Sequence, residues 1–184
     1  MFLSLVVVLW CVDAGELIRI LMDNGLQYGA KCVCIGAVDL DIVRGVADGA
    51  GDGGVVYVVE KDKGKLDELE ELRKQRYGNI KPFYSPLLER IPYLPNGEFN
   101  IALLYHTLER VKPYYLTLLN ETNRILRRDG KAIVVSSVKG LLSRDGIQEK
   151  DFDEAVSTTP LKLEYKVRKG KEIIAVFKRV LSDK

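Results

Sequence analysis

Short, almost continuously apolar runs alternate along this chain with stretches whose apolar residues recur at helical spacing. Such runs suit strands that are buried on both faces, and parallel strands need a helix-length connection between them. The alternation therefore predicts an α/β fold, with helices on both faces of a mostly parallel sheet. We expect strands over residues 31–37, 54–60, 79–85, 99–106 and 131–137, and helices over residues 14–26, 39–50, 63–76 and 114–128.

The end of the chain follows a different pattern. Residues 161–179 alternate apolar and polar side chains about Lys169-Gly170-Lys171, which is typical of two antiparallel strands joined by a tight turn. A short helix is expected before them, over residues 149–159. The hairpin completes a Rossmann-like sheet of seven strands, and 184 residues of which 47% are hydrophobic suit a single domain over residues 1–184.

The first 12 residues, MFLSLVVVLWCV, form an apolar N-terminal extension. The run is shorter than the roughly 20 residues of a membrane helix, and it lacks the basic start and the small-residue cleavage site of a signal peptide. We expect it to be buried as a strand or a helix turn, or to be the docking surface of a homodimer.

Charge and cysteine content narrow the expected surroundings. The 28 basic and 26 acidic residues nearly balance, so neither nucleic acid nor a membrane is an expected partner. The chain has an odd number of cysteines, Cys11, Cys32 and Cys34. The side chains of Cys32 and Cys34 point to the same side of an expected strand, without the geometry of a disulfide bond. A reducing, cytoplasmic setting is therefore expected. The abundance of Lys, Arg and Glu over Gln, Met and His is also seen in heat-adapted proteins.

The turn after the first expected strand, IGAVDL, is the first candidate ligand site, because ligands bind beyond the carboxyl ends of strands in open parallel sheets. Gly36 lets the backbone approach a ligand, and Asp39 can cap a helix whose N-terminus offers free N–H groups. A dinucleotide-binding fingerprint needs two further glycines where this chain has Val38 and Leu40. A bare strand end therefore explains the pattern equally well.

The glycine-rich segment DGAGDGG, residues 48–54, looks more like a nucleotide loop. It follows an expected helix and opens an expected strand, whereas a phosphate-binding loop follows a strand and opens a helix. We interpret it as a helix-to-strand connection.

Four motifs occur in order along the chain: CVCIGAVDL, VVYVVEKD, NGEFNIALLYHTLERV and LLNETNRILRRDGKAIVVSS. Together they resemble the class I S-adenosylmethionine-dependent methyltransferases, and among these the type-11 group that includes enzymes like those of ubiquinone and menaquinone biosynthesis. The resemblance covers roughly residues 14–180. It implies the seven-stranded class I methyltransferase sheet, S-adenosylmethionine as the cofactor and a small-molecule acceptor.

The resemblance also implies site residues. Glu60 maps to the acid that holds the ribose hydroxyls of the cofactor. The only histidine, His106, follows the fourth strand where the acceptor pocket of the family opens, and a neutral imidazole there can accept a proton from the attacking nucleophile. A histidine that only shapes the pocket is the alternative. The other implied cofactor-binding positions are Cys34, Gly36, Ala37, Ser85 and Tyr105.

The chain departs from the family's pattern at several of these positions. The acid of the first strand maps to Cys34, the adenine-side acid to Ser85 and the aspartate of a Phe-Asp pair to Asn100. Val38 and Leu40 replace the second and third loop glycines and would crowd the methionyl part of the cofactor. The second hypothesis is therefore a methyltransferase-like binding or scaffold protein whose cofactor loop has decayed.

Overall fold

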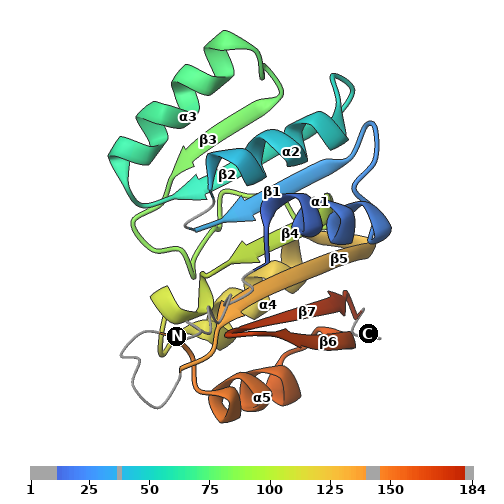
Figure 1. Cartoon of the computed structure of the whole chain (residues 1–184), viewed down its shortest axis with the longest axis vertical. Coiled ribbons are helices and arrows are strands. Elements are labelled where there is room, and N and C mark those ends of the chain that lie inside the picture. Colours follow the sequence, from blue (N-terminus) through green and yellow to red (C-terminus); the bar gives the residue numbers. More distant parts are fainter. Residues whose placement is uncertain (1–11, 37–38, 140–145, 181–184) are drawn as a thin grey trace, which may run out of the picture.

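The structure, a computed structural model, describes residues 12–36, 39–139 and 146–180 (Figure 1). Its helices are α1 (Ala14–Asp23), α2 (Leu40–Ala50), α3 (Lys63–Gln75), α4 (Tyr115–Ile125) and α5 (Glu149–Thr158), with the single-turn 3-10 helix η1 (Leu108–Arg110). Its strands are β1 (Lys31–Ile35), β2 (Val55–Glu60), β3 (Ile80–Tyr84), β4 (Phe99–Tyr105), β5 (Leu126–Ser137), β6 (Lys162–Lys169) and β7 (Glu172–Lys178). Each strand and helix that we expect from residue 14 onward is present.

The seven strands of the described residues form one sheet, in the order β3-β2-β1-β4-β5-β7-β6 (Figure 1). Strands β1 to β5 pair in parallel, and β7 pairs antiparallel with both β5 and β6. The order reverses at β1, because β2 lies on one side of it and β4 on the other. The predicted fold class, a mostly parallel Rossmann-like sheet with a C-terminal antiparallel hairpin, is confirmed.

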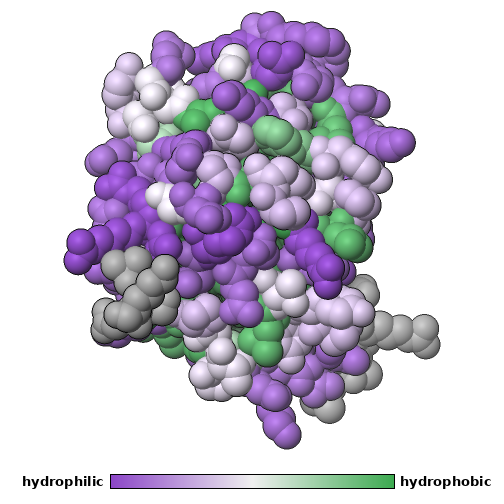
Figure 2. Space-filling model, turned by 180° about the vertical axis from the view of Figure 1, so that it is seen from behind, coloured by the Kyte–Doolittle hydropathy of each residue, from purple (hydrophilic) through white to green (hydrophobic). Residues whose placement is uncertain are grey.

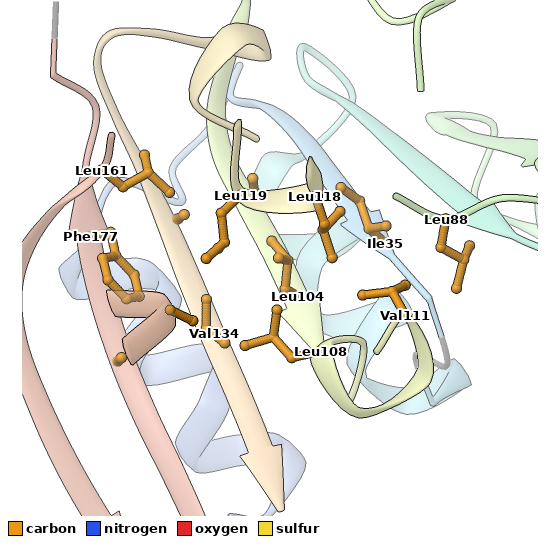
Figure 3. Packing of buried hydrophobic residues seen from close by; sticks show 14 of the residues in the cluster. Ile35, Leu88, Leu104, Leu108, Val111, Leu118, Leu119, Val134, Leu161 and Phe177 are labelled. Atoms are coloured by element: carbon orange, nitrogen blue, oxygen red, sulfur yellow. The ribbon is translucent and has the colours of Figure 1, made fainter. Parts of the chain in front are cut away.

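Helices cover both faces of this sheet. Helices α1, α2 and α3 bury their apolar side chains against one face, and α4, α5 and η1 pack on the other. Figure 3 shows the second face, where Leu104 and Val134 of the sheet lie beside Leu118 and Leu119 of α4. Because burial of each such side chain stabilises the fold by about 1.5–3 kcal/mol, these two apolar layers hold the sheet edges and their loops in place.

Helix α4 is shorter than the sequence pattern predicts. We expect a helix through Arg128, but α4 ends at Ile125, and Leu126 has extended dihedral angles with φ −65° and ψ 141°. Leu126 is buried and pairs with Phe99 of β4. Pairing with β4 therefore takes over from the helix at this point, and this tertiary contact outweighs the local helix propensity of the segment.

The glycine-rich segment after α2 is a helix-to-strand connection, as predicted, because it lies between Ala50 and Val55. Its glycines pack against the ring of Tyr28. A Cβ atom added to Gly51 would lie 2.6 Å from that ring, and one added to Gly53 would lie 2.8 Å from it. The glycines make room for an aromatic side chain rather than for a nucleotide.

No helix within the described ranges is long and apolar enough to cross a membrane. Seen from behind, hydrophilic side chains cover most of the molecule, and apolar side chains form small separate areas (Figure 2). Residues 1–11 lie outside the described part, so the burial of the N-terminal extension and the homodimer stay predictions, as does the cytoplasmic setting.

Candidate functional site

The carboxyl ends of the parallel strands meet along one edge of the sheet, where several predicted site residues lie. Gly36 follows β1, Glu60 ends β2 and His106 follows β4. Because β7 runs antiparallel, its first residue Glu172 lies at the same edge, in register with Ser137 at the end of β5. Since the strand order reverses at β1, this edge is where open α/β sheets bind ligands.

The turn after β1 is built around Gly36. Its φ of +84° is in the left-handed region that favours glycine, and its N–H donates to the carbonyl of Val59 at 2.9 Å. Thr107 fills the space beside it, with Oγ1 only 2.8 Å from the position of an added Cβ atom. The Thr107 hydroxyl donates to the carbonyl of Ile35, which fixes the threonine in this place. The turn therefore requires glycine at this position.

The helix after this turn begins as predicted. Asp39 is the N-cap of α2, and its carboxylate accepts a hydrogen bond from the N–H of Asp41 at 2.8 Å. Leu40, the first residue of the helix, borders the cavity described next. Ala37 and Val38 lie outside the described residues, so their predicted roles in the loop stay predictions.

A cavity of about 400 Å³, here called the first cavity, opens between the turn after β1 and the end of β2. Gly36 and Glu60 both line it. Counting Glu60, its lining has four carboxylates and two basic side chains, from Asp39, Asp41, Glu60, Glu68, Arg44 and Lys65. The volume is within the range of small-molecule sites, about 300–1,000 Å³, and the excess of carboxylates favours a ligand that carries positive charge.

Glu60 is buried and held in a fixed direction. It is 1% exposed, and its Oε1 accepts hydrogen bonds from the N–H groups of Lys61 at 2.7 Å and Asp62 at 3.1 Å. Arg110 of η1 approaches the same oxygen, with Nη2 at 3.4 Å. No hydrogen bond among the described residues uses Oε2 of Glu60, so this oxygen is ready to accept one from a ligand.

Three predicted cofactor-binding residues, Cys34, Ser85 and Tyr105, are not among the described residues that line the first cavity. Cys34 is fully buried in the apolar layer under α1 and α2, and burial raises the pKa of its thiol well above the usual range. The hydroxyl of Ser85 donates to the carbonyl of Leu87 at 2.9 Å, as in a turn. The ring of Tyr105 packs edge-on against His106, with centroids 4.4 Å apart.

His106 lies between two carboxylates in an uncommon backbone conformation. Its φ is +52°, a value that few residues other than glycine adopt. Its Nδ1 is 3.2 Å from Oε1 of Glu109, and its Nε2 is 3.0 Å from Oε1 of Glu172. Burial opposes the charged form, but these hydrogen bonds and charges outweigh it and raise the pKa of His106 to about 9. The imidazole is thus a cation at neutral pH, and a general-base role stays a prediction that requires these contacts to change.

Glu172 ties three segments of the chain together. It is 3% exposed, and its Oε2 accepts a hydrogen bond from the N–H of Val12 at 2.7 Å while its Oε1 contacts His106. Burial alone would raise the pKa of this carboxyl, but the hydrogen bonds from His106 and Val12 hold it below its usual value. Through these two contacts, Glu172 joins the start of the described chain, the end of β4 and the start of β7.

Sequence reasoning misses the partners of both predicted site residues. Arg110, which contacts Glu60, and Glu172, which contacts His106, lie far from those residues along the chain and reach them only through the fold. Glu109 carries a weak signal, because it is three residues after His106 and a short helical turn brings such residues together.

Stability should depend on pH through His106. Because its pKa is about 9 in the folded state and 6.5 ordinarily, the stabilisation is fully present below about pH 6.5 and is lost as the pH rises through 9. We expect a loss of about 1–3 kcal/mol in the free energy of unfolding, allowing for solvent screening. Urea unfolding at several pH values between 6 and 10 measures this loss.

His106→Asn is the matched variant, because asparagine tolerates the left-handed conformation and carries no charge. Its free energy of unfolding should change less across the same pH range. Parallel pH profiles for the parent and the variant would show that another group causes the dependence.

Comparisons with known proteins bear on the fold. Neither a family model nor a curated protein sequence matches this chain. A SAM-dependent methyltransferase from Aquifex aeolicus superposes with a TM-score of 0.73 and 16% identity, over 92% of this chain and 95% of the other. A geranyl diphosphate methyltransferase in complex with SAM gives a TM-score of 0.75 and 11% identity, over 91% and 86%. The fold is that of the class I methyltransferases.

The class I methyltransferase fold also occurs in a protein named for another reaction. A 4+2 cyclase superposes with a TM-score of 0.74 and 10% identity, over 91% of this chain and 81% of the cyclase. A fold shared at such low identity does not determine an activity, which depends on the residues of the site. Membership of the type-11 group stays a prediction.

Proposed function

We propose that this chain is an S-adenosylmethionine-dependent methyltransferase that acts on a small-molecule acceptor. The observation that carries the proposal is the carboxylate of Glu60, which is buried and oriented on a cavity that it shares with the Gly36 turn. A carboxylate can accept hydrogen bonds from both hydroxyls of a ribose, and these charge-assisted bonds are stronger than neutral ones. The solved methyltransferases of the same fold support the proposal.

The residues of the first cavity fit part of the cofactor well. The excess of carboxylates favours the sulfonium and ammonium cations of S-adenosylmethionine, and Glu60 suits its ribose. The fit is weaker elsewhere. The Ser85 hydroxyl is engaged with a backbone carbonyl, and the buried thiol of Cys34 offers no acceptor.

The chain would contribute binding and orientation. When bound, S-adenosylmethionine supplies a methyl group on a positively charged sulfur. Glu60 would hold the ribose, and the glycine turn lets backbone come close to the ligand. Alignment of this kind can supply a large share of the rate of a direct transfer between two bound molecules. His106 would fix Glu109 and Glu172 at the acceptor side of the edge.

Thermal unfolding with S-adenosylhomocysteine, the demethylated product, tests the proposal. At ten times the dissociation constant, a ligand that binds only the folded state stabilises it by about 1.4 kcal/mol. For a chain of this length, we expect the melting temperature to rise by about 3–6 °C. Homocysteine, which lacks the ribose, should produce no shift at the same concentration.

A melting temperature that stays unchanged at millimolar S-adenosylhomocysteine would contradict the proposal. The second hypothesis, a binding or scaffold protein with a decayed cofactor loop, would then replace it. Leu40 favours that outcome, because its side chain borders the first cavity where the family has a glycine.

A further inference from the structure

A second cavity, of about 560 Å³, lies beyond the ends of β4 and β5. Its described lining includes His106, Glu109, Arg110, Lys112, Ser137 and Lys139. Arg110 links it to the first cavity, because the same guanidinium contacts the Glu60 carboxylate at 3.4 Å. A ligand in the second cavity would therefore lie alongside a ligand that is held by Glu60.

The acidic groups around the second cavity are already engaged with neighbours. The carboxylate of Glu109 contacts His106 and accepts hydrogen bonds from the backbone N–H of Ser137 and the hydroxyl of Ser136. Asp151 is paired with Lys112 at 2.7 Å. Glu172 contacts the other side of the His106 ring, so this one imidazolium balances only one of its two carboxylates, while Lys112 balances Asp151. One carboxylate charge therefore remains, against the two basic side chains of Arg110 and Lys139.

Two basic side chains retain hydrogen-bonding capacity. Nη1 of Arg110 is buried and has no hydrogen-bond partner among the described residues. Its other terminal nitrogen makes only the long contact to Glu60. Lys139 is exposed at the cavity, and no ion pair with a described residue engages it. A buried guanidinium N–H without an acceptor is costly. The Arg110 side chain as a whole is 26% exposed, so a turn of its guanidinium plane would bring this N–H to an anion in the cavity.

We propose that the second cavity binds the methyl acceptor through an anionic group, a carboxylate or a phosphate, which Arg110 and Lys139 hold. This inference rests on the proposed methyltransferase function. The planar guanidinium of Arg110 can donate two parallel hydrogen bonds to either group, and the Lys139 ammonium adds a point charge. Contact of Arg110 with Glu60 sets the acceptor beside the cofactor's ribose.

Titration of the ¹⁵N-labelled protein with inorganic pyrophosphate, and separately with benzoate, tests the anion site at fixed ionic strength. We expect saturable shifts of the amides of Arg110, Ser137 and Lys139 with at least one of the two probes. Shifts with pyrophosphate alone would indicate that the acceptor carries a phosphate group, and shifts with benzoate alone would indicate a carboxylate. The proposal fails if neither probe shifts these amides, or if the shifts gather elsewhere.

Variants of the two basic residues test whether they contact the anionic probe. Arg110→Gln and Lys139→Gln should each weaken probe binding by about fivefold or more, because each removes one charge-assisted donor. Since Lys139 is exposed, Lys139→Gln is expected to fold normally even if Arg110→Gln does not. Lys162→Gln is the control, because it removes a lysine from a separate basic hollow near Arg128. Equal losses in all three variants, or a loss only in Lys162→Gln, would overturn the assignment.

The same samples separate this proposal from the proposed function. If S-adenosylhomocysteine raises the melting temperature and neither anion binds, the methyltransferase proposal stands and the anionic acceptor is wrong. If the anions bind at Arg110 and S-adenosylhomocysteine does not bind, an anion site exists but its assignment to a methyl acceptor is wrong.

Discussion

Glu60→Ala should lower the affinity for S-adenosylhomocysteine by about 10- to 150-fold. The variant removes hydrogen bonds between a buried carboxylate and the ribose hydroxyls, which are worth about 1.5–3 kcal/mol. Glu60 is already oriented by the N–H groups of Lys61 and Asp62, so little ordering cost offsets its contribution. Isothermal titration calorimetry of the parent and the variant measures the difference.

Glu68→Ala is the matched control for this prediction. Glu68 lines the same cavity but is exposed, so the variant removes an equal charge without removing an oriented acceptor. Its effect on affinity should stay within about threefold, as is usual for an exposed charge. Unchanged binding by Glu60→Ala would place the ligand elsewhere. Equal losses of affinity in both variants would mean that Glu60 contributes only its negative charge and not an oriented hydrogen bond.

Gly36→Ala should destabilise the folded protein by about 2–4 kcal/mol. The left-handed conformation of Gly36 costs about 1–2 kcal/mol for a residue with a Cβ atom. In addition, the new atom would lie 2.8 Å from Oγ1 and 2.9 Å from Cγ2 of Thr107, which is buried and cannot withdraw easily. Urea unfolding measures the loss.

Gly78→Ala is the control, because nothing lies within 4 Å of a Cβ atom added at Gly78. We expect a change within about 1 kcal/mol there, and replacing a glycine can even stabilise. The double variant Gly36→Ala/Thr107→Ala should recover the steric part of the loss but not the backbone part. If Gly36→Ala and Gly78→Ala change the free energy of unfolding by similar amounts, the turn is not constrained by Thr107.

The fold was predictable because its signals are local. The apolar runs of the strands and the helical spacing between them are properties of neighbouring residues. The N-cap residue Asp39 likewise indicates the start of α2 from the local sequence. The end of α4 was not predictable, because Leu126 leaves the helix to pair with Phe99, which precedes it by a whole strand and helix. Local propensity carries no information about such a pairing.

The candidate site was predictable only in part, for the same reason. Gly36 and Glu60 follow strands, so their meeting at one edge follows from the parallel sheet. The position of Arg110 depends on how η1 folds back towards β2, and the contact of Glu172 with His106 depends on the antiparallel register of β7. These contacts decide the charge state of His106 and the direction of Glu60, and no sequence motif encodes them.

Mapping of S-adenosylhomocysteine on the ¹⁵N-labelled protein tests the central claim most directly. The amides of Lys61 and Asp62 donate to the Glu60 carboxylate, so they report on any hydrogen bond that this carboxylate gains. We predict saturable shifts of these two amides and of Gly36, with the largest shifts gathered at the carboxyl edge of β1 and β2. Saturating ligand that leaves these three amides unchanged, or that shifts mainly residues near Lys162, would contradict the claim that Glu60 holds the cofactor.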